Sequence, residues 1–234
     1  MSSTPRDSAG SILAPADPST RKDLVVQALR DAIISGRLAP GSALNESRLA
    51  EQLRVSRSPL REAIRQLAEE GMVQTVSYKG ARVAQLDGAF VEELYSLRAA
   101  LEEFGVRRLM ARGPVSLESL ERIVANMDRA AARKQRGELV ELDLRFHRTL
   151  CELADHHMLT LHWDKLSNHT RRCINATAGY RRDLTQIAHN HRQLIEVIRD
   201  GGVERATIVL REHIVAAGTG LRQWLVRENT KATR

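Results

Sequence analysis

Aromatic residues are scarce in this sequence. They make up 3% of its 234 residues, whereas hydrophobic residues as a group make up 42%. The apolar residues are mainly Leu, Ala, Val and Ile, and they occur in long runs without proline. Such a composition is typical of packed helices rather than of sheets. We therefore expect a mainly helical fold.

The sequence also lacks long apolar segments. No apolar run approaches the roughly 20 residues that a membrane-spanning helix needs. Residues 1–18 contain neither an apolar signal core nor a basic amphipathic pattern, so we expect a cytoplasmic protein without membrane attachment. The two cysteines, Cys151 and Cys173, form no close-spaced metal or redox motif. Buried, reduced thiols are therefore the expectation for both.

Motifs of hydrolytic enzymes are missing as well. The chain contains no HExxH motif and no paired catalytic carboxylates, and a metal hydrolase needs such a general base beside its metal-bound water. We predict that the protein is not an enzyme. Its formal net charge of +7 favours an anionic partner, and nucleic acid is a better candidate than an anionic membrane surface.

The length is sufficient for two domains. Residues 1–20, rich in Ser, Pro, Ala and Asp, are interpreted as a flexible tail. We predict a winged helix-turn-helix over residues 21–85 and an all-helical bundle of about six helices over residues 86–228. The breaks expected between the helices of this bundle are Gly113-Pro114, Gly137, residues 155–157, Gly179 and Gly201-Gly202.

Three helical patterns and one hairpin pattern follow one another between residues 23 and 84. The first helix ends at Gly36, the second begins near Asn45, and Ser56 can cap the third. Alternating apolar residues around a Lys79-Gly80 turn then predict a small two-stranded β hairpin. Three helices followed by a hairpin is the element order of a winged helix-turn-helix.

The third helix carries a row of arginines. Arg57, Arg61 and Arg65 are four residues apart and project from one helix face. In a helix-turn-helix this helix enters the major groove of double-stranded DNA, where arginine can bond O6 and N7 of guanine. Such a row can also be merely a solvated face, but its place between a tight turn and a basic hairpin favours DNA binding. The full set of residues predicted to contact bases, phosphates or the minor groove is Arg48, Ser56, Arg57, Ser58, Arg61, Arg65, Lys79 and Gly80.

All eight histidines lie in the second half of the chain. Asp143 and His147 are four residues apart and share a helix face, while His191 and His213 belong to two further helical segments. Three imidazoles and one carboxylate suit a divalent metal ion, Zn²⁺ foremost, with Ni²⁺ and Mn²⁺ as alternatives. Spacing alone leaves open that these histidines are surface residues or are hydrogen-bonded in a core. His189 should face away from His191, because two residues along a helix turn a side chain by about 200°.

Longer motifs carry a resemblance to a known family. The run LRDAIISGRLAPGSALNESRLAEQLRVSRSPLREAIRQLAEEGMV, followed by KGARV, closely resembles the N-terminal domain of GntR-family transcription regulators. LYSLRAALE, DLRFHRTLCELA, HRQLIEVIRDG and REHI resemble the helical, FCD-type effector-binding domain of the FadR-like subfamily. The resemblance implies a homodimer that binds a palindromic operator and responds to a small organic or sugar acid.

The resemblance also implies roles for individual residues. It places DNA contacts at Arg57, Arg61 and Gly80, whereas another frequent contact position falls on Ser47, with the arginine displaced to Arg48. Arg98 matches an arginine that lines the effector pocket, where its guanidinium could hold a carboxylate. The alternative for Arg98 is a helix-surface ion pair with Glu102, four residues on. The implied ligands of a divalent metal are Asp143, His147, His191 and His213.

Three rival functions stay open at this level. The first is a metal hydrolase with an accessory DNA-binding domain, which the missing general base disfavours. The second is a metal sensor in which the ion itself is the signal. The third is a helical interaction module without a ligand, which exposed histidines would favour.

Overall fold

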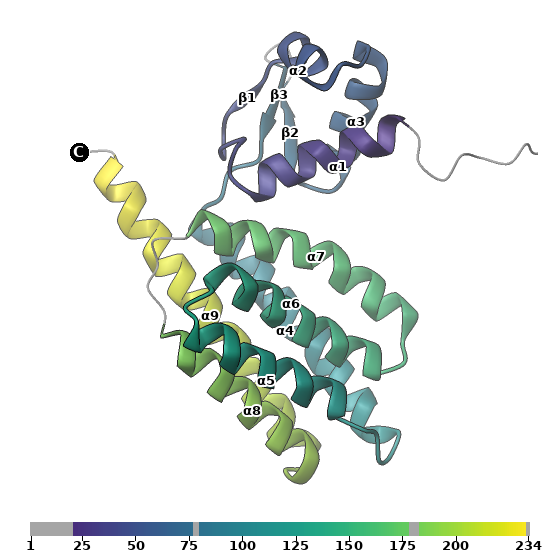
Figure 1. Cartoon of the computed structure of the whole chain (residues 1–234), viewed down its shortest axis with the longest axis vertical. Coiled ribbons are helices and arrows are strands. Elements are labelled where there is room, and N and C mark those ends of the chain that lie inside the picture. The colour runs from purple at the N-terminus through teal and green to yellow at the C-terminus, as the bar shows by residue number, and fades with distance from the viewer. Residues whose placement is uncertain (1–20, 77–79, 178–182, 233–234) are drawn as a thin grey trace, which may run out of the picture.

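The protein is described here by a computed structural model that covers residues 21–76, 80–177 and 183–232. The predicted tail over residues 1–20, the wing residue Lys79 and the expected break at Gly179 lie outside the described residues. The chain forms an N-terminal domain and a helical bundle, each around its own hydrophobic core (Figure 1). The predicted mainly helical fold with an N-terminal winged helix-turn-helix is confirmed.

The N-terminal domain combines three helices with a small sheet. Its core joins one face of the first helix to one face of the third, through side chains such as Leu29, Ile33, Leu60 and Leu67, which are at most 2% exposed. The elements in chain order are α1 (Arg21–Ile34), β1 (Ala43–Leu44), α2 (Glu46–Leu53), α3 (Arg57–Glu69), β2 (Val73–Val76) and β3 (Gly80–Val83).

The sheet contains one strand more than the predicted hairpin. The short strand β1 pairs with β3 in an antiparallel manner, so the strand order is β1-β3-β2. The Val83 N–H donates to the Ser42 carbonyl at 2.9 Å, and the Gly41 N–H donates to the Val83 carbonyl at 3.0 Å. A two-residue strand is too short to show an alternating sequence pattern. Strand β1 forms because it pairs with β3, a distant segment of the chain.

Local capping orients the two helices of the helix-turn-helix. The Asn45 side chain accepts a hydrogen bond from the Arg48 N–H at 3.0 Å, as expected of an N-cap. Arg54 then adopts a left-handed conformation with φ 53°, which ends α2 and turns the chain into α3. Ser56 holds the N-cap position of α3, but its side chain makes no capping hydrogen bond.

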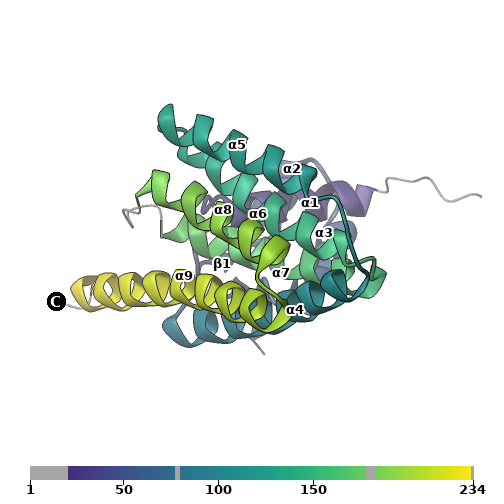
Figure 2. The ribbon, with the colours of Figure 1, turned by 90° about the horizontal axis from the view of Figure 1, so that it is seen from below.

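Six helices follow within the described residues, in agreement with the predicted number. They are α4 (Gly88–Ala111), α5 (Glu118–Ala132), α6 (Arg136–Leu153), α7 (His157–Ala176), α8 (Leu184–Asp200) and α9 (Val203–Ala232). Seen from below, α4 and α9 lie side by side along one edge of the bundle and α5 lies along the opposite edge (Figure 2). Cys151 and Cys173 are buried free thiols, as expected.

The helix break predicted at Gly137 is present but lies slightly earlier, between the end of α5 at Ala132 and the start of α6 at Arg136. Helix α6 already begins at Arg136, and Gly137 lies inside its first turn. The chain reverses slightly earlier, where Lys134 has a positive φ of 55°. A lysine in a left-handed conformation carries no sequence signal, whereas the glycine three residues later suggested a turn that the backbone does not make there.

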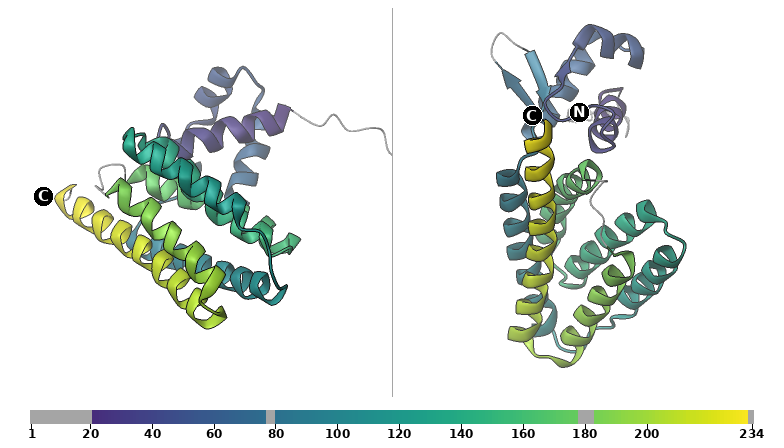
Figure 3. Two further views of the ribbon diagram at one scale, coloured as in Figure 1. Left: turned by 60° about the horizontal axis from the view of Figure 1, so that its bottom comes forward. Right: turned by 90° about the vertical axis from the view of Figure 1, so that its left-hand side faces the viewer.

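Helix α7 is the part of the bundle that faces the N-terminal domain (Figures 1 and 3). Three of its side chains bond backbone carbonyls there: His169 that of Glu70, Arg172 that of Ala84, and Asn175 that of Ile34. Two of these carbonyls belong to the ends of α3 and α1, where helices leave carbonyl groups unpaired. Separately, no helix among the described residues is long and apolar enough to cross a membrane.

Candidate metal centre and nucleic-acid interface

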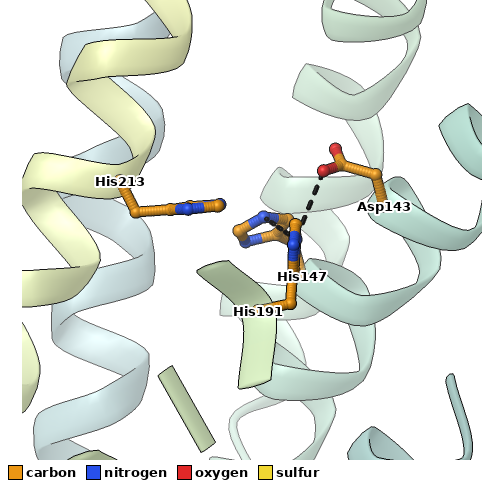
Figure 4. A group of neighbouring side chains, drawn as sticks. All are labelled: Asp143, His147, His191 and His213. Atoms are coloured by element: carbon orange, nitrogen blue, oxygen red, sulfur yellow. Dashed lines mark hydrogen bonds and ion pairs between the residues drawn. The ribbon is translucent and has the colours of Figure 1, made fainter. Parts of the chain in front are cut away.

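Four side chains from three helices converge inside the bundle (Figure 4). Asp143 and His147 come from successive turns of α6, His191 from α8 and His213 from α9. One potential ligand atom of each residue lies within 4.8 Å of those of the other three. The structure thus brings together all four residues that the sequence analysis grouped, while His189 is exposed and faces elsewhere.

The two innermost histidines both direct Nε2 into the cluster. The Nδ1 of His147 donates to the Oε2 of Glu102 at 2.5 Å, and the Nδ1 of His191 donates to the Ile187 carbonyl at 2.7 Å. Each ring therefore directs its Nε2 into the cluster, where these two atoms are 3.3 Å apart, and the Nε2 of His191 is also 3.2 Å from Oδ1 of Asp143. This convergence of nitrogen and oxygen ligand atoms suits a cation bound between them.

The charge states of the cluster also suit a metal. Burial lowers the pKa of His147, and burial next to His191 and His147 lowers that of His213 well below its usual range. Burial opposes ionisation of Asp143, but the hydrogen bond and charge of His191 prevail and hold its pKa well below the usual range. Neutral imidazoles beside an ionised carboxylate are the forms in which these side chains bind metals.

The cavity at this cluster is small. Its volume is about 20 Å³, and it is lined by the four clustered residues together with Tyr95, Arg98 and Asn190 among others. A volume of this size accommodates an ion or a water molecule. A sugar acid does not fit the cavity in this conformation.

Arg98 combines the two predicted alternatives. It lines the cavity and also pairs with Glu102, with 2.6 Å between its Nε and Oε1. The pair is buried, with exposed side-chain fractions of 3% and 0%, so the expectation of a surface ion pair is wrong about its location. The helical repeat of α4 alone places Arg98 and Glu102 side by side, but the packing of α6 and α7 against α4 removes them from water.

Glu102 is a residue of this site that the sequence analysis missed. Its Oε1 accepts from Arg98 and from the indole N–H of Trp163 at 2.9 Å, and its Oε2 accepts from His147. Burial opposes its ionisation, but His147 and Arg98 prevail and lower its pKa to about 2. The only sequence signal was the spacing of four residues from Arg98, because His147 and Trp163 are 45 and 61 residues away.

The arginines of α3 are exposed beside α2. The Nη2 of Arg57 donates to the Ser47 hydroxyl at 3.2 Å, and the Nε of Arg61 pairs with Glu46 at 2.7 Å. Arg61 keeps a side-chain exposure of 62% and can therefore leave this pair for another acceptor. Arg65 is exposed too, but it also lines a cleft between the two domains together with residues of α7.

The remaining residues predicted to contact DNA lie around the same end of the domain. Arg48, Ser56 and Ser58 are exposed at the starts of α2 and α3. Ser58 donates to Glu62 at 3.4 Å. Gly80 is exposed at the start of β3 with φ 80°, a conformation that favours glycine, while Lys79 lies outside the described residues.

Comparison with known proteins identifies both domains. Residues 21–83 match the family described as bacterial regulatory proteins, gntR family, and residues 93–216 match the FCD domain. The chain belongs to the GntR family. It is thus a DNA-binding transcription regulator with a GntR DNA-binding domain and an FCD domain.

Individual GntR regulators are similar over most of their length. The gluconate operon transcriptional repressor of Bacillus subtilis (strain 168) is 30% identical over 181 residues, which cover 75% of this chain and 74% of the repressor. The HTH-type regulator YdhC of the same organism is 27% identical over 80% of this chain and 83% of its own. The solved structure of McbR/YncC from E. coli shares the fold, with a TM-score of 0.71 and 19% identity over 88% of this chain and 98% of that one.

Proposed function

We propose that this GntR regulator binds a divalent metal, Zn²⁺ foremost, at Asp143, His147, His191 and His213. The observation that carries the proposal is the convergence of three potential ligand atoms: the Nε2 atoms of His147 and His191 are 3.3 Å apart, and the Nε2 of His191 is 3.2 Å from Oδ1 of Asp143. A cation at this point can be bound by both nitrogens and by the Asp143 carboxylate, which also adds a balancing negative charge. Ni²⁺ and Mn²⁺ accept the same donor types.

Elemental analysis of the purified protein tests this site directly. We expect a divalent metal in the wild type and its loss in the variant His147→Ala, His191→Ala. His189→Ala is the matched control, because this histidine lies on α8 two residues from His191 but is exposed. Equal metal content in all three proteins would place the ion elsewhere.

We further propose that a small carboxylate effector, an organic or sugar acid, binds this metal and thereby changes operator affinity. A metal held by four protein ligands can accept a further oxygen ligand, and Arg98 at the same cavity offers a guanidinium to the carboxylate. A relative of this chain represses a gluconate operon, and gluconate carries a carboxylate beside a hydroxyl group. Because the cavity is only about 20 Å³, effector binding has to favour a more open arrangement of the bundle.

The small cavity also favours a second function, in which the metal ion itself is the signal. The two functions differ in what changes DNA affinity. Operator binding should be measured with metal-depleted protein, with Zn²⁺ alone, and with Zn²⁺ plus gluconate. A response only to the acid supports the effector function, whereas a full response to Zn²⁺ alone supports metal sensing.

We also propose that the protein acts in the cytoplasm as a homodimer on a palindromic operator. Two-fold symmetric operators match two copies of a helix-turn-helix. Helices α4 and α9 pack side by side, and each exposes two large apolar side chains seven residues apart: Leu97 and Phe104 on α4, Ile208 and Val215 on α9. Exposed apolar side chains of this kind favour coverage by a second copy.

In each copy Arg57 and Arg61 would read bases, while the contacts to the DNA backbone would come from Arg48, Ser56, Ser58, Lys79 and Gly80.

A further inference from the structure

The joint between the two domains contains a buried arginine with few partners. Arg172 on α7 is 1% exposed and donates from Nη2 to the Ala84 carbonyl. Its Nε and Nη1 are buried and have no hydrogen-bond partner among the described residues. Leaving donors of a charged group buried and unpaired is strongly unfavourable.

The other buried arginine among the described residues shows the contrast. Arg98 is 3% exposed and has a carboxylate partner, Glu102, at 2.6 Å. Within the described residues no carboxylate forms an ion pair with Arg172, and burial lowers the pKa of its guanidinium. Arg172 therefore has the chemistry of an anion-binding residue without the anion.

Arg172 lines a cavity of about 630 Å³ between the domains. This volume lies within the range of roughly 300–1,000 Å³ that is usual for small-molecule sites. Both domains contribute apolar walls, which include Ile33 and Ile34 of α1, Leu86 of the linker, and Trp224 and Leu225 of α9. The site therefore pairs one cationic group with a partly apolar wall.

We propose that this cavity is a second ligand site, which binds an organic monocarboxylate with an apolar body. The carboxylate pairs with Arg172, and the apolar body packs on Trp224 and the end of α1. Binding requires the guanidinium to turn toward the cavity, which sacrifices its hydrogen bond to the Ala84 carbonyl. Asp87 on the cavity wall disfavours a second negative charge on the ligand.

This site goes beyond the proposed metal centre and is independent of it. A ligand that touches α1, the linker and α9 at once stabilises the relative position of the two domains seen here. It thereby alters how two copies of α3 can be presented to an operator. The two sites also require different ligands. The cavity between the domains requires an apolar body, whereas the proposed metal centre requires oxygen atoms that bind a metal.

Fluorescence of Trp224 offers a direct readout. The chain contains two tryptophans, so the variant Trp163→Phe leaves Trp224 as the only one. In this background, depleted of metal with a chelator, we expect hexanoate and benzoate to change the emission of Trp224 in a saturable manner. Inorganic phosphate, which lacks an apolar body, should have a much smaller effect.

Substitutions at neighbouring positions make the test specific. Arg172→Gln should weaken hexanoate binding by about tenfold or more, as expected for the loss of a charge-assisted pair. Arg171→Gln is the matched control, because Arg171 lies next to Arg172 on α7, pairs with Glu141 of α6 on the surface, and its loss changes the net charge equally. Ala176→Leu provides a second test, since its larger side chain narrows the cavity and should weaken hexanoate binding while leaving Arg172 in place.

Three outcomes would overturn the proposal. One is the absence of a saturable change at millimolar hexanoate. Another is equal affinity in the Arg172→Gln and Arg171→Gln variants. The third is a saturable change that appears only when Zn²⁺ is added back and is lost in the variant His147→Ala, His191→Ala, which would place the acid at the metal centre. If the metal centre fails its own test while hexanoate still binds in an Arg172-dependent manner, the proposal for the cavity between the domains holds without the proposed metal centre.

Discussion

At the scale of single residues, Glu102 links three helices through one carboxylate. It accepts hydrogen bonds from Arg98 on α4, His147 on α6 and Trp163 on α7. Its bond to His147 holds the ring in the tautomer whose Nε2 faces the cluster. A carboxylate in this position also raises the basicity of a metal-binding imidazole. Glu102 is thus a positioning residue for the proposed metal centre.

We predict that Glu102→Gln lowers Zn²⁺ affinity by about 10- to 100-fold, because the amide removes the negative charge behind His147. Competition with a chelating dye measures the affinity. Glu103→Gln is the control, since Glu103 is the next residue of α4 and pairs with Arg211 on α9 instead. Equal affinity in the two variants would mean that Glu102 does not position the ligand.

At the scale of elements, the start of α3 is held against α2 by two side chains that we propose contact DNA. Arg57 bonds Ser47 and Arg61 bonds Glu46. These contacts restrict both side chains before any DNA binds. Because the Arg61 pair is solvent-exposed, it contributes little to stability and leaves the arginine available to a guanine or a phosphate.

We predict that Arg61→Ala weakens specific operator binding by about 1–3 kcal/mol while leaving the fold intact. Fluorescence anisotropy with operator and scrambled DNA, at one fixed salt concentration, separates specific from general binding. Arg145→Ala is the control, because Arg145 is exposed on α6 of the bundle and its removal changes the net charge by the same amount. Unchanged specific affinity in Arg61→Ala would refute the groove assignment.

A second relation between elements brings α9, and with it His213, close to α4. An added Cβ at Gly218 would lie 2.6 Å from Cγ of Tyr95, closer than atoms of packed side chains approach. Tyr95 is buried on α4 one turn before Arg98. The absence of a side chain at Gly218 therefore permits the close packing of the two helices that line the proposed metal centre.

We predict that Gly218→Ala destabilises the protein by about 1–3 kcal/mol, because the extra methyl group forces α9 away from α4. Gly137→Ala is the matched control. An added Cβ there meets no atom within 4 Å, and Gly137 lies in a helix, so alanine should stabilise it by up to about 1 kcal/mol. Chemical denaturation measures both changes. A Gly218→Ala variant at least as stable as the wild type would argue against the tight α4–α9 contact.

At the scale of the whole molecule, the two domains meet through α7 and through the cavity beside the linker. The hydrogen bonds of His169, Arg172 and Asn175 all go to backbone carbonyls of the N-terminal domain. An event in the bundle that moves α7 therefore acts on the N-terminal domain directly. Such a movement changes the spacing between the α3 helices of two copies only if the two copies form a dimer.

We predict that Phe104→Glu or Ile208→Glu yields a monomer with weaker operator binding, because each buries a charge in the proposed contact between copies. Sedimentation equilibrium measures the mass of the protein in solution. Leu24→Glu is the control, since Leu24 is an even more exposed apolar residue, on the N-terminal domain. A wild type that is itself monomeric, or variants that stay dimeric, would contradict this interface.

Relations within one helix were accessible from the sequence. The repeat of the α-helix alone predicted that Asp143 and His147 share a face, that His189 turns away from His191, and that Arg57 and Arg61 project together. Local chemistry likewise predicted the Asn45 cap. These relations depend only on neighbouring backbone, which is why they could be read without a fold.

Relations between helices were decided by tertiary structure. The sequence suggested that His191 and His213 could meet the α6 pair, but the contact of Glu102 with His147 and the burial of the Arg98 pair carried no local signal. Strand β1, which the sequence did not predict, and the cavity at Arg172 also arise from segments far apart in the chain. Side-chain packing determines such contacts, because the free energy of burying a group depends on what every neighbouring element contributes around it.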